Sequence, residues 1–174
     1  VTPVTIKGDP VNMRLKAHRE WMAEFREINE GKIVLSPEEM DMVMRMKDSV
    51  YANPAASGYI TDLTVDRNEV VGIKNIQGMN CKAMCDADFS YRGILVDFKT
   101  TRQHLGIQFA KDAIYKYGYQ FQAAHYCDVF DAERFIFIVV RNFPPYETLV
   151  FEIPEEMMGQ ARIINYQTLD RINW

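Results

Sequence analysis

An acid and a base stand two residues apart in an otherwise apolar stretch, at Asp97 and Lys99. The stretch from Ile94 to Phe98 is apolar and β-branched enough to form a buried strand. Side chains two apart in a strand point to the same face, so Asp97 and Lys99 are predicted to share one. The alternative is an ordinary solvated strand face, but such a face is normally polar throughout.

A second strand is predicted just before the first, over residues 79–88, where small and polar side chains alternate. If the loop between the two strands is Ser90 to Gly93, counting places Phe89 opposite Ile94. The same register places Asp86 opposite Asp97. A shift of one residue would move the two acids to opposite faces.

Two directly opposed carboxylates repel each other unless a proton or a cation lies between them. Oxygen-only ligands suit Mg²⁺ or Mn²⁺, and a lysine on the same face favours the ionised acids. Asp86, Asp97 and Lys99 are therefore predicted to form a site for a divalent metal ion.

These residues resemble a known family. Asp86, ten intervening residues and Asp97-Phe98-Lys99 resemble the D…(D/E)xK core of PD-(D/E)XK nucleases. Residues 81–86, 96–101 and 117–126 together resemble the nuclease domain of the RecE, exonuclease VIII-like family of phage-type exonucleases. The D-x-K-T-T string, followed about twenty residues later by Y-x-x-Q-x-x-x-Y, is the specific part of this resemblance.

The resemblance implies a set of roles. Asp86, Asp97, the backbone carbonyl of Phe98 and Glu69 would hold one or two Mg²⁺ or Mn²⁺ ions, and Lys99 would act on the attacked phosphate. For Glu69 an exposed turn residue is the alternative. The family also has a motif histidine on an upstream helix. His18 does not match its setting, so the chain is expected to be one domain over residues 1–174, lacking the N-terminal part of the full-length protein.

Residues 105–130 are compatible with helix, with a break expected at Gly118. Tyr115, Tyr119, Gln122 and Tyr126 are spaced four, three and four apart, so they are predicted to share one face. Packing of the tyrosines on the sheet is the alternative to a role in the site. An amide on an aromatic face needs hydrogen-bond partners. The resemblance makes Gln122 and Tyr126 catalytic residues that orient Lys99 and contact the DNA backbone.

The order of expected elements is helix, strands, helix, strand, strand, helix, which fits an α+β fold with a central mixed β-sheet flanked by helices. This is the PD-(D/E)XK, restriction-endonuclease-like core. Residues 134–141 are expected to be an interior strand, and residues 59–80 two short strands about residues 66–68. A helix beginning at Pro37 is predicted from Ser36 and Glu39, and either Thr100 or Thr101 is expected to cap the helix that follows them.

Composition limits the function classes. The 174 residues carry a formal net charge of −4, which argues against binding nucleic acid by bulk charge. Basic residues nevertheless gather near the predicted site in sequence, and those assigned to DNA binding are Lys82, Arg102, Lys111 and Lys116. No apolar run is long enough for a membrane span and no leader is evident, so a cytoplasmic protein of a bacterial or phage-infected cell is expected.

The expected function is Mg²⁺-dependent exonucleolytic hydrolysis of phosphodiester bonds at duplex DNA ends. The resemblance implies 5′-to-3′ polarity, a role in phage-type recombination or repair, a homo-oligomer, and a single-strand annealing protein as a further partner. Three alternatives stay open: an endonuclease of the same superfamily, a non-catalytic module that binds DNA ends or protein, and a hydrolase of small phosphorylated substrates. The last lacks a glycine-rich phosphate loop and clustered histidines in this sequence.

Overall fold

The computed structural model describes residues 12, 14–62 and 64–172, which contain six α-helices and five strands. The helices are α1 (Lys16–Ile28), α2 (Pro37–Ala52), α3 (Pro54–Thr61), α4 (Ile107–Tyr115), α5 (Tyr119–Phe130) and α6 (Glu155–Ile172). The strands are β1 (Asn68–Ile76), β2 (Met79–Phe89), β3 (Ile94–Thr101), β4 (Arg134–Arg141) and β5 (Thr148–Glu152). Within these described residues, no helix has the length and apolarity needed to cross a membrane.

The chain divides into two compact units, residues 1–42 and residues 43–174. In the first unit, α1 stacks the rings of Trp21 and Phe25, with centroids 5.4 Å apart. Helix α2 begins in the same unit with a capping box, since the Ser36 N–H donates to Glu39 Oε2 (2.8 Å) and the Glu39 N–H donates to Ser36 Oγ (3.1 Å). The predicted start of this helix is confirmed.

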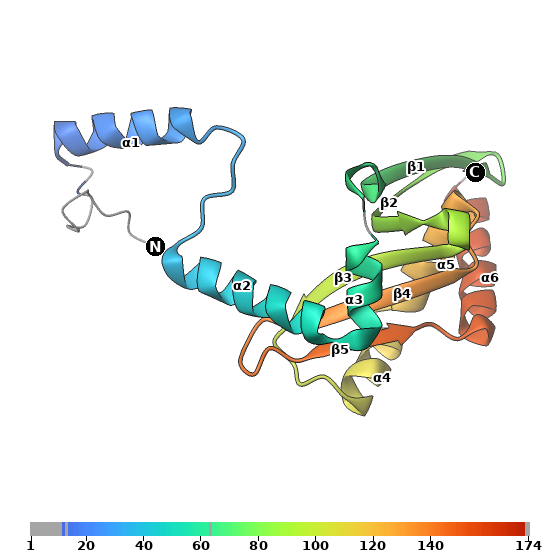
Figure 1. The fold of residues 1–174 in the computed structure, drawn as a ribbon. Helices are drawn as coiled ribbons and strands as arrows, with labels where there is room; N and C mark the ends of the chain where they lie inside the picture. Colours follow the sequence, from blue (N-terminus) through green and yellow to red (C-terminus); the bar gives the residue numbers. More distant parts are fainter. Residues whose placement is uncertain (1–11, 13, 63, 173–174) are drawn as a thin grey trace. The chain divides into compact units, whose positions relative to one another are not determined.

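The second unit is built on one mixed sheet in the order β1-β2-β3-β4-β5 (Figure 1). Only β3 and β4 are parallel, and the other neighbours are antiparallel. A parallel pair needs a long crossover connection, which α4 and α5 provide here. This arrangement confirms the expected α+β core with a mixed sheet flanked by helices.

Side-chain alternation in β4 shows how the two faces of the sheet are covered. Phe135, Phe137 and Val139 belong to a core cluster that includes residues of α4, α5 and α6. Ile136 and Ile138 belong to a second cluster, with Val50 of α2 and Ala56 of α3. A strand buried on both faces reads as a continuous apolar run, so the prediction of an interior strand over residues 134–141 is confirmed.

Two local predictions are wrong. Of the two short strands expected within residues 59–80, the second is present as β1, but the first is wrong, because Tyr59 and Ile60 lie in α3 and residues 65–67 form a 3₁₀ turn. Asn53 and Pro54 do end α2, yet the Asn53 side chain also accepts from the N–H groups of Ala55 and Ala56 and so caps α3. The same two residues thus stop one helix and start the next.

The other wrong prediction concerns the threonines after Lys99. Strand β3 continues through Thr100 and Thr101, and α4 begins only at Ile107, after Gly106. The Thr101 hydroxyl instead accepts from the N–H of Gln103, at 3.1 Å. This bond shapes the loop between β3 and α4.

Helix α5 approaches the β1–β2 hairpin closely at Gly72. A methyl group at Gly72 would lie 2.9 Å from Val129 Cγ1 and 2.9 Å from Phe130 Cζ, both on α5. Val129 is buried and β-branched, so it has little freedom to move aside. The absence of a side chain at Gly72 therefore sets the distance between the hairpin and α5.

Replacing Gly72 by alanine is expected to destabilise the protein by about 1–3 kcal/mol, because the added methyl forces the hairpin away from α5. The matched control is Gly159→Ala in α6, where a methyl would meet nothing within 4 Å. That change is expected to stabilise the protein by about 0.5–1 kcal/mol through the lost flexibility of glycine in a helix. Urea unfolding of both variants measures the two effects, and equal signs would contradict the packing argument.

Candidate active site

Strand β3 places Asp97 and Lys99 beneath the helices of the larger core cluster. Leu95, two residues before Asp97, packs in that cluster, whereas Ile94 and Val96 pack on the opposite face. Asp97 is only 3% exposed. The Lys99 ammonium lies 2.6 Å from Asp97 Oδ2, and its side chain is 29% exposed. The predicted shared face is therefore present, and it is a buried face with one ion pair.

Strand β2 brings Asp86 to the same place. The pairs Phe89–Ile94 and Ala87–Val96 have the register predicted from the hairpin loop. One more step of this register gives Asp86 opposite Asp97, just past the last recorded pair. Asp86 Oδ2 there accepts a hydrogen bond from the Phe98 N–H at 2.7 Å. The two acids therefore meet at one point on neighbouring strands.

The sheet is irregular at this point. Cys85 packs in the cluster that includes α5, whereas Ala87 packs in the cluster that includes α2 and α3, although residues two apart normally share a face. On β1, Glu69 has a φ of +53°, a left-handed conformation that is uncommon for a residue other than glycine. The side chains of β2 therefore switch from one face of the sheet to the other at Asp86, the residue that lies opposite Asp97.

Helix α5 supplies Gln122, whose Nε2 donates a hydrogen bond to Asp97 Oδ1 at 2.6 Å. The Gln122 amide was expected to orient Lys99, but its hydrogen bond goes to the Asp97 carboxylate. The Lys99 ammonium lies over the ring of Tyr119, 5.9 Å from its centroid. Tyr126, one turn after Gln122, packs its ring against Phe135 with centroids 5.8 Å apart. Burial raises the pKa of the Tyr126 hydroxyl, and the negative charge of Asp97 raises it further.

Tyr115 does not share this face. It lies at the end of α4 and is 81% exposed, because the chain turns at Gly118 before α5 begins. Gly118 has a φ of +67°, which glycine adopts without strain. The expected break at Gly118 is confirmed, and it removes Tyr115 from the row formed by Tyr119, Gln122 and Tyr126.

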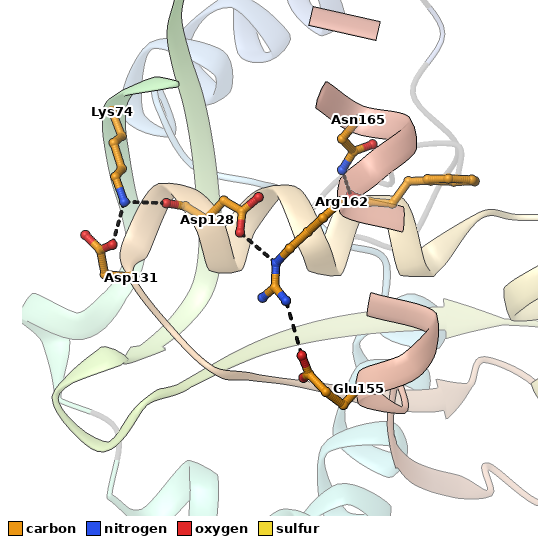
Figure 2. A network of polar contacts seen from close by, with 7 residues as sticks. Lys74, Asp128, Asp131, Glu155, Arg162 and Asn165 are labelled. Carbon is orange, nitrogen blue, oxygen red and sulfur yellow. Dashed lines mark hydrogen bonds and ion pairs between the residues drawn. The ribbon is translucent and has the colours of Figure 1, made fainter. Parts of the chain in front are cut away.

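Polar contacts hold α5 in place from its other sides (Figure 2). Lys74 of β1 donates to the Asp128 carbonyl at 2.9 Å, and Arg162 of α6 donates to the Asp128 carboxylate at 2.9 Å. Asn165 of α6 donates to the Phe121 carbonyl at 3.0 Å. Because β1 and α6 both bind α5, the helix is fixed and the Gln122 amide is aimed at Asp97.

Burial governs the charge state of the central acid. It raises the pKa of Asp97, because a charged carboxylate is poorly solvated there, and the negative charge of Asp86 adds to the rise. The Lys99 ammonium and the Gln122 amide oppose the shift. Each oxygen of the carboxylate thus has a partner, because Oδ2 lies 2.6 Å from the Lys99 ammonium and Oδ1 accepts from Gln122.

These donors fit a hard divalent cation. Asp86 and Asp97 offer carboxylate oxygens on neighbouring strands, and oxygen ligands are those that Mg²⁺ and Mn²⁺ prefer. Glu69 is exposed at the start of β1, and no recorded contact joins it to either aspartate among the described residues. In that same part of the chain, no three His, Cys, Asp or Glu side chains form a ready metal-binding group. The roles of Glu69 and of the Phe98 carbonyl stay predictions.

The four predicted DNA-binding residues are all exposed and lie on different elements. Lys82 is on β2, where its carbonyl lies 3.3 Å from His125 Nε2 of α5. Arg102 follows β3, and Lys111 and Lys116 lie on and just after α4. Their assignment to DNA stays a prediction.

Sequence reasoning missed a buried arginine beside the site. Arg141 at the end of β4 is 6% exposed and is paired in register with Thr101. Its guanidinium donates to the Arg102 carbonyl (3.3 Å) and the Pro144 carbonyl (3.0 Å), so it holds the loop that follows β3. No sequence signal distinguishes this arginine from any charge that ends an apolar strand.

Two solved structures are similar to this chain at low sequence identity. A crystal structure of a "Putative exonuclease" from Eubacterium rectale matches with a TM-score of 0.62 and 13% identity, over 88% of this chain and 61% of that protein. The chain thus spans less than two thirds of that protein's length. A phage-related exonuclease from Haemophilus somnus 129PT matches with a TM-score of 0.43 and 12% identity, over 91% of this chain and 85% of that one. No curated protein matches.

The structural likeness at this level of identity concerns the fold alone. A family model provides the more direct result, because it matches residues 11–174, nearly the whole chain. Its description is "PDDEXK-like domain of unknown function (DUF3799)". The suggested resemblance to PD-(D/E)XK nucleases is thereby confirmed at the level of the fold and the superfamily. The chain belongs to the family of PDDEXK-like domains DUF3799.

Proposed function

We propose that this protein is a divalent-metal-dependent exonuclease that hydrolyses phosphodiester bonds at the ends of duplex DNA. The observation that carries the proposal is the buried Asp97, bound by Lys99 and Gln122 and opposed by Asp86. A lysine, two acids and an amide on one buried face are more than strand stability needs, since a buried ion pair is weak support for stability. Clustered groups with a perturbed pKa are typical of functional sites.

Each residue has a definable task in this proposal. Asp86 and Asp97 would hold Mg²⁺ or Mn²⁺, which supplies Lewis-acid polarisation of the phosphate and a more acidic bound water. Gln122 keeps the Asp97 carboxylate in one orientation through its 2.6 Å hydrogen bond. Lys99 holds a positive charge at the carboxylate and would offset negative charge developing on the attacked phosphate. Tyr126, one turn after Gln122 on α5, would contact the DNA backbone.

The finer features of the proposal come from the resemblance. They are 5′-to-3′ polarity, a role in phage-type recombination, a homo-oligomer, a single-strand annealing partner and a cytoplasmic location in a bacterial or phage-infected cell. Lys82, Arg102, Lys111 and Lys116 would contact the DNA backbone, and Glu69 would complete the metal ligands. Contacts to phosphate carry no sequence information, so little sequence preference is proposed.

An endonuclease is the nearest alternative, and a closed circular duplex separates the two activities. An exonuclease leaves the circle intact and releases nucleotides from linear DNA, whereas an endonuclease cuts both. The non-catalytic module, which binds DNA ends or protein, predicts binding without cleavage of either substrate. The intact set of Asp86, Asp97 and Lys99 favours a catalyst over this module.

Asp97→Asn and Lys99→Ala are each expected to lower the rate of nucleotide release from linear duplex with Mg²⁺ by at least about 100-fold, because each removes charge from the reacting centre. Duplexes labelled at the 5′ or the 3′ end report the polarity. Asp170→Asn, at an exposed position near the end of α6, is the matched control and is expected to leave the rate unchanged. Full activity of Asp97→Asn would refute the assigned site.

Asp97→Asn is expected to lower activity but to raise thermal stability. The folded-state pKa of Asp97 is raised, so its ionised form destabilises the fold above that pKa. Without divalent metal, Asp97→Asn is therefore expected to have a higher Tm than the unmodified protein at neutral pH. The difference in Tm between the two proteins should shrink as pH falls through the raised folded-state pKa of Asp97. Below the pKa of Asp97 in the unfolded chain it should stay constant, because the carboxyl is then uncharged in both the folded and the unfolded state.

Thermal unfolding across pH, with and without Mg²⁺ or Mn²⁺, measures this. Bound metal is expected to stabilise the unmodified protein by about 2.7 kcal/mol at a hundredfold excess over Kd, and so to raise its Tm, whereas the Tm of Asp97→Asn should not change. An equal rise in both proteins would mean that the metal binds elsewhere.

A further inference from the structure

A chain of aromatic rings runs from the core of the sheet past Lys99 to the surface. The ring of Phe137 stacks on that of Tyr119, with centroids 4.9 Å apart, and Tyr119 lies against Tyr117 with centroids 5.8 Å apart. The Lys99 ammonium lies over the Tyr119 ring at 5.9 Å. The outermost ring, that of Tyr117, is 41% exposed. A partly exposed ring is thus connected to Lys99 through one intervening ring.

Tyr117 is held in position although it is exposed. Its hydroxyl accepts a hydrogen bond of 2.8 Å from Gln103 Nε2, in the loop after β3. Its backbone N–H donates to the Asp112 carbonyl at 2.9 Å, which closes the end of α4. Aromatic rings fixed in this way offer contact area at a low entropic cost on binding. The loop that Gln103 belongs to is itself bound by Arg141.

Positive charge lies over this ring. The Lys116 ammonium is over the Tyr117 ring, 5.3 Å from its centroid, and Arg102 directly precedes Gln103 in the sequence. Both side chains are exposed. A fixed, exposed aromatic face with neighbouring lysine and arginine is the pattern that binds single-stranded nucleic acid through base stacking and backbone contacts.

We propose that Tyr117 is a stacking platform for an unpaired nucleobase of the DNA end, next to the catalytic site; this rests on the proposed function. Its ligand is a single-stranded or frayed DNA end. Every base has a π-face, so the platform has little base preference. Tyr117 is a positioning residue, since it fixes the strand while Asp86, Asp97 and Lys99 act on the phosphate.

A purely structural role would make the Gln103 hydrogen bond the important feature and the ring face irrelevant. Tyr117→Phe removes the hydroxyl and keeps the ring, whereas Tyr117→Leu removes the ring. The matched control is Tyr115→Leu, which removes another exposed tyrosine two residues away. Thermal unfolding of the three variants verifies that each is folded.

The probe is a duplex with a short overhang that carries 2-aminopurine as its unpaired base and phosphorothioate linkages that resist hydrolysis. Stacking on the ring is expected to quench its fluorescence with the unmodified protein, Tyr117→Phe and Tyr115→Leu. Tyr117→Leu is expected to lose the quench and to bind the overhang about 5- to 150-fold more weakly. Its affinity for a blunt duplex should change much less.

Two failures are distinguishable. If the unmodified protein cleaves linear DNA but Tyr117→Leu quenches and binds like Tyr115→Leu, the platform is overturned and the nuclease proposal stands. A loss of quench in Tyr117→Phe equal to that in Tyr117→Leu also overturns the platform, because it assigns the effect to the hydroxyl. If the unmodified protein neither binds nor cleaves any of these DNAs, the proposed function fails, and the platform fails with it.

Discussion

The carboxylate of Asp97 is almost fully buried, and burying an unpaired charge costs several kcal/mol. Lys99 on the same strand, Gln122 on α5 and Asp86 on β2 surround it. These groups are separated by up to 36 residues in sequence, from Asp86 to Gln122. The site therefore exists only once the hairpin, the central strand and the crossover helix have all assembled, and the charge of Asp97 gains its partners only then.

The position of α5 is the constraint that this arrangement places on the rest of the unit. The helix approaches β1 at Gly72, is bound by Lys74 and Arg162 at its end, and begins after the left-handed turn at Gly118. Movement of α5 by 1 Å would stretch the 2.6 Å bond from Gln122 beyond an ordinary hydrogen bond. Contacts on the far side of the helix thus determine the geometry at Asp97.

Much of this could be predicted from local patterns. The four-residue loop fixes the register of the β2–β3 hairpin, and the apolar run at residues 134–141 indicates a strand buried on both faces. Other features depend on tertiary contacts. Whether Gln122 binds Lys99 or Asp97 is decided by the height of α5 over the sheet, and Arg141 is buried only because a loop folds over it. At Asn53-Pro54 the same residues both end and begin a helix, so the local signal is ambiguous.

A net charge of −4 leaves the problem of how such a chain would hold a polyanion. Bulk attraction is absent, so affinity must come from local cations and from interactions that do not depend on charge. The Lys116 ammonium lies over the Tyr117 ring, and the ring itself offers stacking that salt does not screen. Binding by this route would weaken less with ionic strength than binding by a broad basic surface.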